Sequence, residues 1–373
     1  MDSVDDDLFD DLTGDERTQR ERLLARLRDD GFTPDELANA ARERRLALLP
    51  VDRLLGGAYT AAEVEERTGL PAETLIRTRR LQGLPEPAPD ERAFSDEDID
   101  AAHSAQLFLT VGFDQGRIDE IARVLGEGMG RLSATITAAF ADTFLEAGDG
   151  EADVSERFAT LAQQLTPATA PILMAAFRAH LRDSVARAVL GREELETGAV
   201  VGAQEVAVCF ADMVGFTHLG GRVDVGELGT VAGRLASLSA SLTVAPVRLI
   251  KTIGDAALLV SPEPAPLVAV ALELVEAFER EELPSLRAGI AVGPATVHAG
   301  DYYGNSVNLA SRVTGVARPA SVLCTREVRD AAPDGFRWSA AGRHRLKGVS
   351  GPTPLYRAHP LPRSPASKRV RKP

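Results

Sequence analysis

The spacing of hydrophobic residues changes near residue 205, and this change divides the chain into two parts. From residue 16 to about residue 196, apolar residues recur every three or four positions, which predicts α-helices. After residue 205, short β-branched runs alternate with helical stretches, which predicts strands and helices in turn. We therefore expect a helical domain over residues 1–196, a linker over 197–204 and a second domain of mixed class over 205–358.

Capping residues mark several helices of the first part. In the segment 58–100, Thr60 begins a short helix, Gly69 ends it and a second helix follows, which is a helix-turn-helix-like pattern. Two long helices are predicted over residues 117–147 and 170–196, because apolar residues keep the helical spacing throughout both. Everything before the linker is therefore expected to be helical.

The second part has the element order of an α+β sandwich. Its first strand is the run VAVCFA, which ends at Ala211, and adjacent strand pairs are expected within 246–261 and 286–299. The second of these pairs is expected as two separate strands, over 286–292 and 295–299. This order fits a ferredoxin-like fold, in which helices cover an antiparallel sheet. The other expected elements are helices over 225–241, 264–282 and 305–316 and a strand over 321–325.

The chain is acidic overall and unevenly charged at its ends. Its 42 basic and 55 acidic residues give a net charge of −13, which opposes nonspecific binding to nucleic acid. Residues 2–16 carry eight acids, whereas residues 363–372 carry five bases. We expect residues 359–373 to form a disordered basic tail in solvent.

The cysteines and the hydropathy of the chain indicate where in the cell the protein is located. Cys209 and Cys324 each lie in an apolar, strand-like run, which predicts buried thiols and no disulfide framework. No run of 18 apolar residues occurs, so no transmembrane helix is predicted. The acidic N-terminus lacks the apolar core of a signal peptide, and a cytoplasmic location is expected.

Two aspartates stand at the ends of predicted strands. Asp212 lies in FADMVGFT, directly after a buried strand, and Asp255 lies in KTIGDA, in a turn between two strands. Taken singly, Asp255 is more typical of an ordinary Gly-Asp turn, and Asp212 could be a surface residue that caps the next helix. Together, carboxylates at adjacent strand ends are typical ligands of divalent cations when phosphates complete the coordination.

Further polar residues follow in two short motifs. GDYYGNSVNLASR places Asn308 and Arg312 four residues apart on one face of a predicted helix, with Asp301 in the preceding loop. LKGV places Lys347 before a glycine at a strand end, where its ammonium group can reach a phosphate. Taken singly, Lys347 is more typical of a solvent-exposed surface residue, and Arg312 could be an ion-pair partner on the helix surface.

Together these motifs resemble the catalytic domain of class III nucleotidyl cyclases. All four occur in the family's order, and the resemblance covers about residues 203–358. It implies cyclisation of a nucleoside triphosphate with two divalent cations, Mg²⁺ or Mn²⁺, as cofactors. It also implies these roles: Asp212 and Asp255 bind the metals, Lys251 and Asp301 read adenine, Asn308 orients the ribose, Arg312 stabilises the transition state, Lys347 binds the triphosphate, and Phe216 and Thr217 form the turn near the phosphates.

The implied base-reading pair indicates ATP as the substrate. Adenine presents an acceptor at N1 and a donor at N6, which match the ammonium of Lys251 and the carboxylate of Asp301. Guanine presents the opposite pattern, and a polar mismatch in a buried site is costly. A guanylyl cyclase is therefore the alternative that this pair disfavours.

The resemblance also implies a homodimer with shared active sites. One chain would supply Asp212 and Asp255, and its partner would supply the residues that bind the base, the ribose and the phosphates. Because this chain contains all of them, two complete and symmetric sites can form in a homodimer.

The N-terminal part resembles the helical regulatory domains of actinobacterial soluble cyclases, some of which respond to pH. We expect it to control the catalytic domain by shifting one chain against the other. Its Ala- and Leu-rich helices could enclose a small apolar ligand such as a fatty acid, although core packing explains the same residues. A DNA-binding regulator is a further alternative, supported by Arg77, Arg79 and Arg80 and opposed by the acidic loop 86–98.

Overall fold

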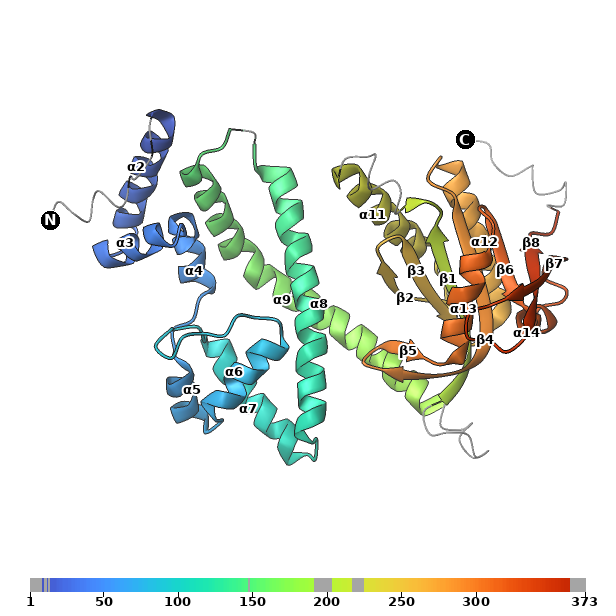
Figure 1. Ribbon diagram of the computed structural model, residues 1–373. Helices are drawn as coiled ribbons and strands as arrows, with labels where there is room; N and C mark the ends of the chain where they lie inside the picture. The colour runs from blue at the N-terminus through green and yellow to red at the C-terminus, as the bar shows by residue number, and fades with distance from the viewer. Residues whose placement is uncertain are drawn as a thin grey trace. The chain divides into compact units, whose positions relative to one another are not determined.

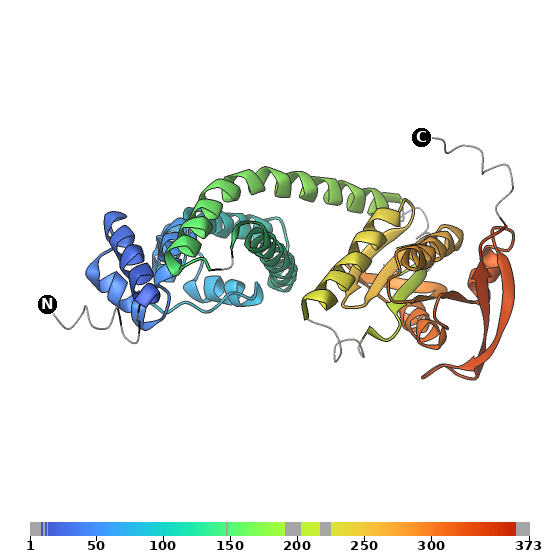
Figure 2. The ribbon, with the colours of Figure 1, turned by 90° about the horizontal axis from the view of Figure 1, so that it is seen from above.

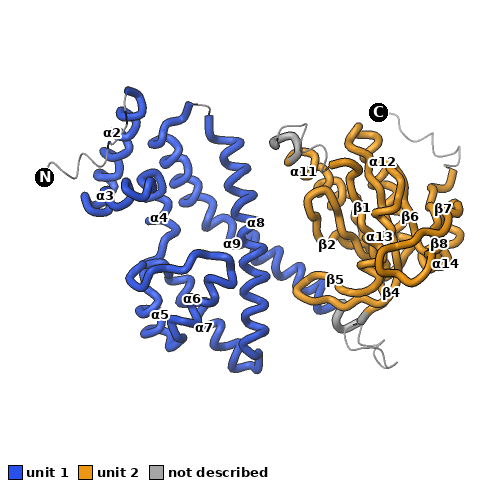
Figure 3. The backbone as a smooth tube through the Cα atoms, viewed as in Figure 1, with its two compact units in different colours: residues 1–186 blue, residues 187–373 orange. Residues whose placement is uncertain are grey.

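The computed structural model divides the chain into two compact units, residues 1–186 and residues 187–373 (Figure 3). It describes Phe9, Leu12 and residues 14–146, 148–190, 203–216 and 225–362. Most of the predicted linker and most of the predicted tail lie outside these residues, so both stay predictions.

Unit 1 is built from helices joined by short connections (Figure 1). Short helices come first along the chain, and two long helices follow. A β-bridge between Tyr59 and Phe94 closes the helix-turn-helix-like segment. The elements of this unit are α2 (Gly14–Asp29), α3 (Pro34–Arg42), the 3-10 helix η1 (Leu46–Leu48), α4 (Leu49–Leu55), α5 (Ala61–Thr68), α6 (Ala72–Leu81), α7 (Asp96–Thr110), α8 (Gln115–Phe144) and α9 (Glu151–Leu190).

Capping residues determine where the short helices begin. Thr60 and Ser95 each form a capping box, in which the side chain and the third helical residue satisfy backbone N–H groups reciprocally. Gly69 ends α5 in the left-handed conformation, with φ of 72°, as expected for a glycine after a helix. Val64, Leu75 and other apolar residues of this segment pack into a core of their own.

The second long helix begins earlier than its sequence predicts. The expected helix over 170–196 is part of α9, which starts at Glu151, and residues 191–196 lie outside the described part of the chain. Pro167 and Pro171 lie inside α9. Proline removes one backbone hydrogen bond and crowds the preceding turn, so it favours either a break or a bend. Here α9 continues and curves along its length (Figure 2).

Unit 2 is an eight-stranded sheet with helices on its faces (Figure 1). The strand order is β2-β3-β1-β4-β6-β8-β7, and β5 pairs with β4. Neighbouring strands are antiparallel except for β4 and β6. The elements are β1 (Ala203–Met213), α11 (Val225–Leu242), β2 (Arg248–Ile253), β3 (Ala256–Ser261), α12 (Pro264–Arg280), β4 (Leu286–His298), β5 (Asp301–Tyr303), α13 (Asn305–Val316), β6 (Ser321–Thr325), α14 (Arg326–Ala331), β7 (Arg337–Arg345) and β8 (Pro352–His359).

The order β2-β3-β1-β4, with α11 and α12 in the crossovers, confirms the predicted α+β, ferredoxin-like fold. Both faces of β1 are buried, because successive side chains of a strand point to opposite faces. Ala207 and Cys209 face the core that contains α12, whereas Val206 and Val208 face the core that contains Ala310 of α13. Strand β1 is therefore fixed from both sides, and the position of Asp212 near its end is fixed with it.

One predicted pair of strands is a single long strand. The expected strands 286–292 and 295–299 are joined in β4, and the segment Gly293–Pro294 does not interrupt them. The reason is long-range pairing, since β4 pairs with β1 continuously from Leu286 to Thr296. The turn that Gly and Pro predict locally is overridden by this ladder.

Both cysteines are buried free thiols, as predicted. Burial raises the pKa of Cys209 to about 12. Burial also raises the pKa of Cys324, and the neighbouring Cys209 adds to this effect. Because a thiolate is the reactive form, both thiols serve packing and not chemistry.

Candidate active site

The two aspartates of the predicted metal site lie on adjacent strands of the sheet. Asp212 is opposite Ala256 in the register of β1 and β3, and Asp255 directly precedes Ala256. The backbone N–H of Met213 donates to the carbonyl oxygen of Asp255 at 3.0 Å. Gly254 allows the turn, since its φ of 58° lies in the left-handed region. The fold thus brings two carboxylate residues to neighbouring strand ends.

Arg287 is a residue of this region that the sequence motifs do not indicate. It lies on β4 opposite Asp212, and its Nη2 and Nε atoms donate to the Oδ2 atom of Asp212 at 2.6 and 3.0 Å. Both side chains are about three-quarters buried, with 28% and 22% of their surface exposed. A partly buried carboxylate therefore already has a cation beside it, and a metal ion would compete with this guanidinium for the same oxygen.

The predicted base-reading pair is assembled within one chain. The Nζ atom of Lys251 on β2 lies 2.5 Å from the Oδ2 atom of Asp301 on β5, and both side chains are about two-thirds buried. Arg248, also on β2, donates to the hydroxyl of Tyr302 at 3.0 Å. Strands β2 and β5 are not neighbours in the sheet order, so these two contacts connect its separated parts. A hydrogen-bond donor and an acceptor are consequently held side by side.

The remaining polar residues lie on α13 and in the turn between β7 and β8. Asn308 and Arg312 are both on α13, where Asn308 is exposed and Arg312 is half-buried. Gly348 in the turn has a φ of 71°, and a Cβ atom there would lie 3.4 Å from the Nη2 atom of Arg312. The turn that carries Lys347 therefore passes close to the guanidinium of Arg312. This places two cationic residues near each other, as binding of a polyphosphate requires.

Phe216 packs against the main core of unit 2. Thr217 lies outside the described residues.

The donor set fits a hard divalent cation that shares its coordination with a substrate. Asp212 and Asp255 offer oxygen atoms, which Mg²⁺ and Mn²⁺ prefer. Within the described residues, no cluster of three or more metal-ligating side chains occurs. Two carboxylates leave most coordination positions to other ligands, and phosphate oxygens would fill them.

An α+β sheet of this topology, with paired carboxylates, a donor–acceptor pair and a basic turn, defines a nucleotide cyclase domain. Residues 1–185 match the family described as "Adenylate cyclase regulatory domain". Residues 200–358 match the family described as "Adenylate and Guanylate cyclase catalytic domain".

Curated relatives extend the similarity over both parts of the chain. A "pH-sensitive adenylate cyclase" of Mycobacterium tuberculosis is 40% identical over 363 residues, which are 94% of this chain and 91% of that protein. An "Adenylate cyclase" of Streptomyces coelicolor is 30% identical over 268 residues, 71% of this chain and 69% of that protein. The chain therefore belongs to the class III adenylate cyclases of the actinobacterial type, in which a regulatory domain precedes the catalytic domain.

Among solved structures, the adenylyl cyclase CyaB from P. aeruginosa is similar to this chain. The alignment covers 43% of this chain and 96% of the CyaB chain, with 20% identity and a TM-score of 0.39. The family assignment rests on the family matches and the curated relatives. In the part of the chain that the structure describes, no helix is long and apolar enough to cross a membrane.

Proposed function

We propose that the protein converts ATP to 3′,5′-cyclic AMP and pyrophosphate. The observation that carries this proposal is the contact between Lys251 and Asp301, which holds a donor and an acceptor 2.5 Å apart. The ammonium can donate to N1 of adenine while the carboxylate accepts from the N6 amino group. A guanine base would place its own donor against the ammonium and its own acceptor against the carboxylate. Such a mismatch leaves polar groups unpaired, so ATP is favoured over GTP.

The reaction is an intramolecular phosphoryl transfer, in which the ribose 3′-oxygen attacks the α-phosphorus and pyrophosphate leaves. Asp212 and Asp255 would hold two divalent cations, which supply activation of the 3′-hydroxyl and charge neutralisation of the triphosphate. Asn308 would orient the ribose, because positioning is the main requirement of this chemistry. Arg312 and Lys347 would offset charge that develops on the phosphates, and the turn that carries Lys347 passes close to the guanidinium of Arg312.

A direct assay tests the proposed activity. The full-length chain is incubated with ATP or GTP in Mg²⁺ or Mn²⁺, and the cyclic nucleotide and pyrophosphate are quantified by chromatography. Cyclic AMP should form in preference to cyclic GMP with either cation. Formation of cyclic GMP at an equal or higher rate would contradict the assignment of ATP.

Arg287 is proposed to have two alternative partners during this reaction. In the free chain it neutralises Asp212 at 2.6 Å, and once cations bind Asp212 its guanidinium becomes available to the triphosphate. Replacing Arg287 by Ala should lower kcat/KM for ATP by about 10- to 1,000-fold, as expected for loss of a group that stabilises phosphate charge. Arg287→Lys is the matched control, because it keeps the charge but loses the paired donors, and its loss should be smaller. Equal activity of wild type and Arg287→Ala would refute this role.

We further propose that the active unit is a homodimer, in which each site combines residues of both chains. All proposed site residues are present in this chain, so two symmetric sites can form. Unit 1 adds an independent observation, since Met174, Phe177, Leu181 and Val185 of α9 are 50, 60, 49 and 52% exposed. The helical spacing of these apolar residues produces a continuous face that the unit itself does not cover. A second copy of the chain is the partner that would cover it.

Unit 1 is proposed to regulate the cyclase domain, with pH or a small apolar ligand as the signal. The support is the family match of residues 1–185 and the "pH-sensitive" description of the mycobacterial relative. A truncated chain of residues 197–373 should differ from the full chain in cyclase activity by about fivefold or more at some pH between 5 and 8, which is a typical coupling. Identical activities and identical pH profiles for the two chains would rule out this regulation.

The DNA-binding alternative is disfavoured by the contacts of the arginines on α6. Arg77 forms an ion pair with Asp119, and Arg80 lies 2.7 Å from Glu86. Arg79 donates to the carbonyl oxygen of Ala93 at 3.0 Å. Side chains that pair within the unit are not directed at phosphates, so the contacts of this segment favour a packing role. A gel shift with salt-sensitive binding would revive the alternative.

A further inference from the structure

A small cavity in unit 2 has an unusual charge pattern. Its volume is about 250 Å³, and it lies between the end of α13, β6 and the hairpin of β7 and β8. None of its eight lining residues is acidic, whereas two are arginines and one is a histidine. The residues used below are Arg318, Leu323, Ser339, Ala341, His344 and Arg357.

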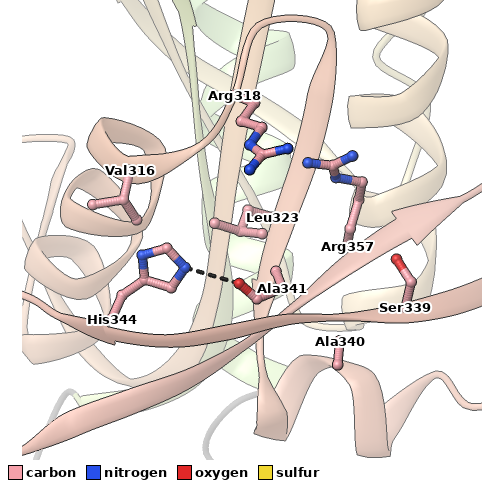
Figure 4. Close-up of a pocket in the computed structure, with 8 residues that line it drawn as sticks. All are labelled: Val316, Arg318, Leu323, Ser339, Ala340, Ala341, His344 and Arg357. Carbon is pink, nitrogen blue, oxygen red and sulfur yellow. Dashed lines mark hydrogen bonds between the residues drawn. The ribbon is translucent and has the colours of Figure 1, made fainter.

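The two arginines approach each other from different parts of the fold. Arg318 lies in the connection from α13 to β6, and Arg357 lies on β8. Figure 4 shows their guanidinium groups turned toward one another at the cavity. Two like charges that face each other repel. An anion between them would convert this repulsion into two attractive contacts.

Hydrogen bonding of Arg357 supports the same conclusion. Its Nε atom is buried and has no hydrogen-bond partner. Among the described residues, no carboxylate lies within ion-pair distance of Arg318 or Arg357. A buried guanidinium N–H without an acceptor destabilises the fold, because burial removes its hydrogen bond to water and no protein acceptor replaces it. An acceptor at this position would satisfy the Nε–H group, and a negatively charged acceptor would also neutralise the guanidinium.

Other groups at the cavity add donors and positive potential. The Nε2 atom of His344 donates to the carbonyl oxygen of Ala341 at 3.0 Å, which fixes the imidazole ring at the cavity wall (Figure 4). Burial, and then the positive charges of Arg337 and Arg357, lower the pKa of His359 at the end of β8. The sequence from residue 335 to the C-terminus contains no acid, although the whole chain is strongly acidic. The positive potential of this region is thus uncompensated by neighbouring residues.

We propose that this cavity binds a phosphate-type oxyanion between Arg318 and Arg357. The planar guanidinium matches a phosphate oxygen pair with two parallel hydrogen bonds, and two arginines can hold one phosphate from opposite sides. The hydroxyl of Ser339 on the same wall lies 2.9 Å from the Nε2 atom of His359, and it can donate to the anion when that nitrogen carries the proton. The bound anion would join β8 to the segment after α13. Arg312 lies on α13 and Lys347 lies in the turn before β8, but the binding itself does not depend on the roles proposed for those residues.

Calorimetric titration of the full-length chain tests this proposal. Inorganic phosphate, pyrophosphate and ATP are titrated in separate arms, without divalent cations. Phosphate should bind at one site per chain, and Arg318→Gln and Arg357→Gln should each weaken it about tenfold or more, as expected when a charge-assisted contact is lost. Arg337→Gln is the matched control, because it removes the same charge from β7 without lining the cavity. It should change the affinity by less than about twofold, as exposed charges do.

The three arms distinguish the source of the anion. If both variants lose more affinity for pyrophosphate or ATP than for phosphate, the cavity is assigned to a polyphosphate. If they lose affinity for phosphate alone, the cavity is assigned to free phosphate. The proposal is overturned if none of the three anions binds, or if wild type and both variants bind them equally. Arg318 lies in an exposed connection, so its variant should fold even if that of Arg357 does not. The phosphate arm is independent of the proposed function, because the comparison of wild type with Arg318→Gln and Arg357→Gln tests residues of the cavity alone, whereas ATP can also bind the proposed active site.

Discussion

Two inactive variants of this protein should restore activity to each other when they form mixed dimers. Asp212→Ala removes a proposed metal ligand, and Asn308→Ala removes the proposed ribose-positioning group. Each homodimer should lose about 100-fold or more in kcat, because both of its sites are defective. In a mixed dimer, one site would combine the intact Asp212 of one chain with the intact Asn308 of the other. A 1:1 mixture with random pairing should therefore recover about one quarter of the wild-type activity.

The matched control mixes Asp212→Ala with Asp255→Ala. Both residues would come from the same chain at each site, so every site of this mixed dimer lacks one metal ligand. No recovery is expected. Differently tagged chains allow the mixed dimers to be purified and their cyclic AMP production measured. A verified mixed dimer of Asp212→Ala and Asn308→Ala without recovered activity would refute the shared site, as would equal recovery in the control.

Exchanging the proposed base-reading residues should invert the nucleotide preference. In the double variant Lys251→Glu with Asp301→Lys, the acceptor and the donor trade places and match the N1–H and O6 groups of guanine. The ratio of kcat/KM for ATP to that for GTP should fall by about 10³-fold or more, given the cost of unpaired polar groups in a site. The measurement is chromatographic quantification of cyclic AMP and cyclic GMP over a range of nucleotide concentrations.

The ion pair of the free chain provides an internal control for folding. In the wild type, the Nζ atom of Lys251 lies 2.5 Å from the Oδ2 atom of Asp301. The exchange keeps opposite charges at these two positions, so the thermal stability of the double variant should be close to that of wild type. Lys251→Glu alone places two acids together and should be inactive with both nucleotides. A folded double variant that still prefers ATP would show that other residues read the base.

Local features of unit 1 could be predicted from the sequence, because they depend on neighbouring residues. Thr60, Gly69 and Ser95 delimit helices through contacts within three or four positions, and the structure has these caps. The extent of α9 could not be predicted, since a proline in a helical sequence is compatible with either a break or a bend. The exposed apolar residues of α9 show a related limit. Their periodicity predicts an apolar face on the helix. It does not tell whether another part of the same chain or a partner chain buries that face.

Periodicity, turn residues and motif spacing are local properties, so the two-part organisation, the ferredoxin-like class and the candidate residues of the four motifs could be predicted from the sequence. Which distant residues come into contact depends instead on how the strands pair across the sheet. Arg287 lies against Asp212 because the register of β1 and β4 aligns them, and Arg357 meets Arg318 because β8 pairs with β6. Strand β4 continues through Gly293 and Pro294 for the same reason. Pairing between distant strands sets these contacts, and local preferences carry no information about it.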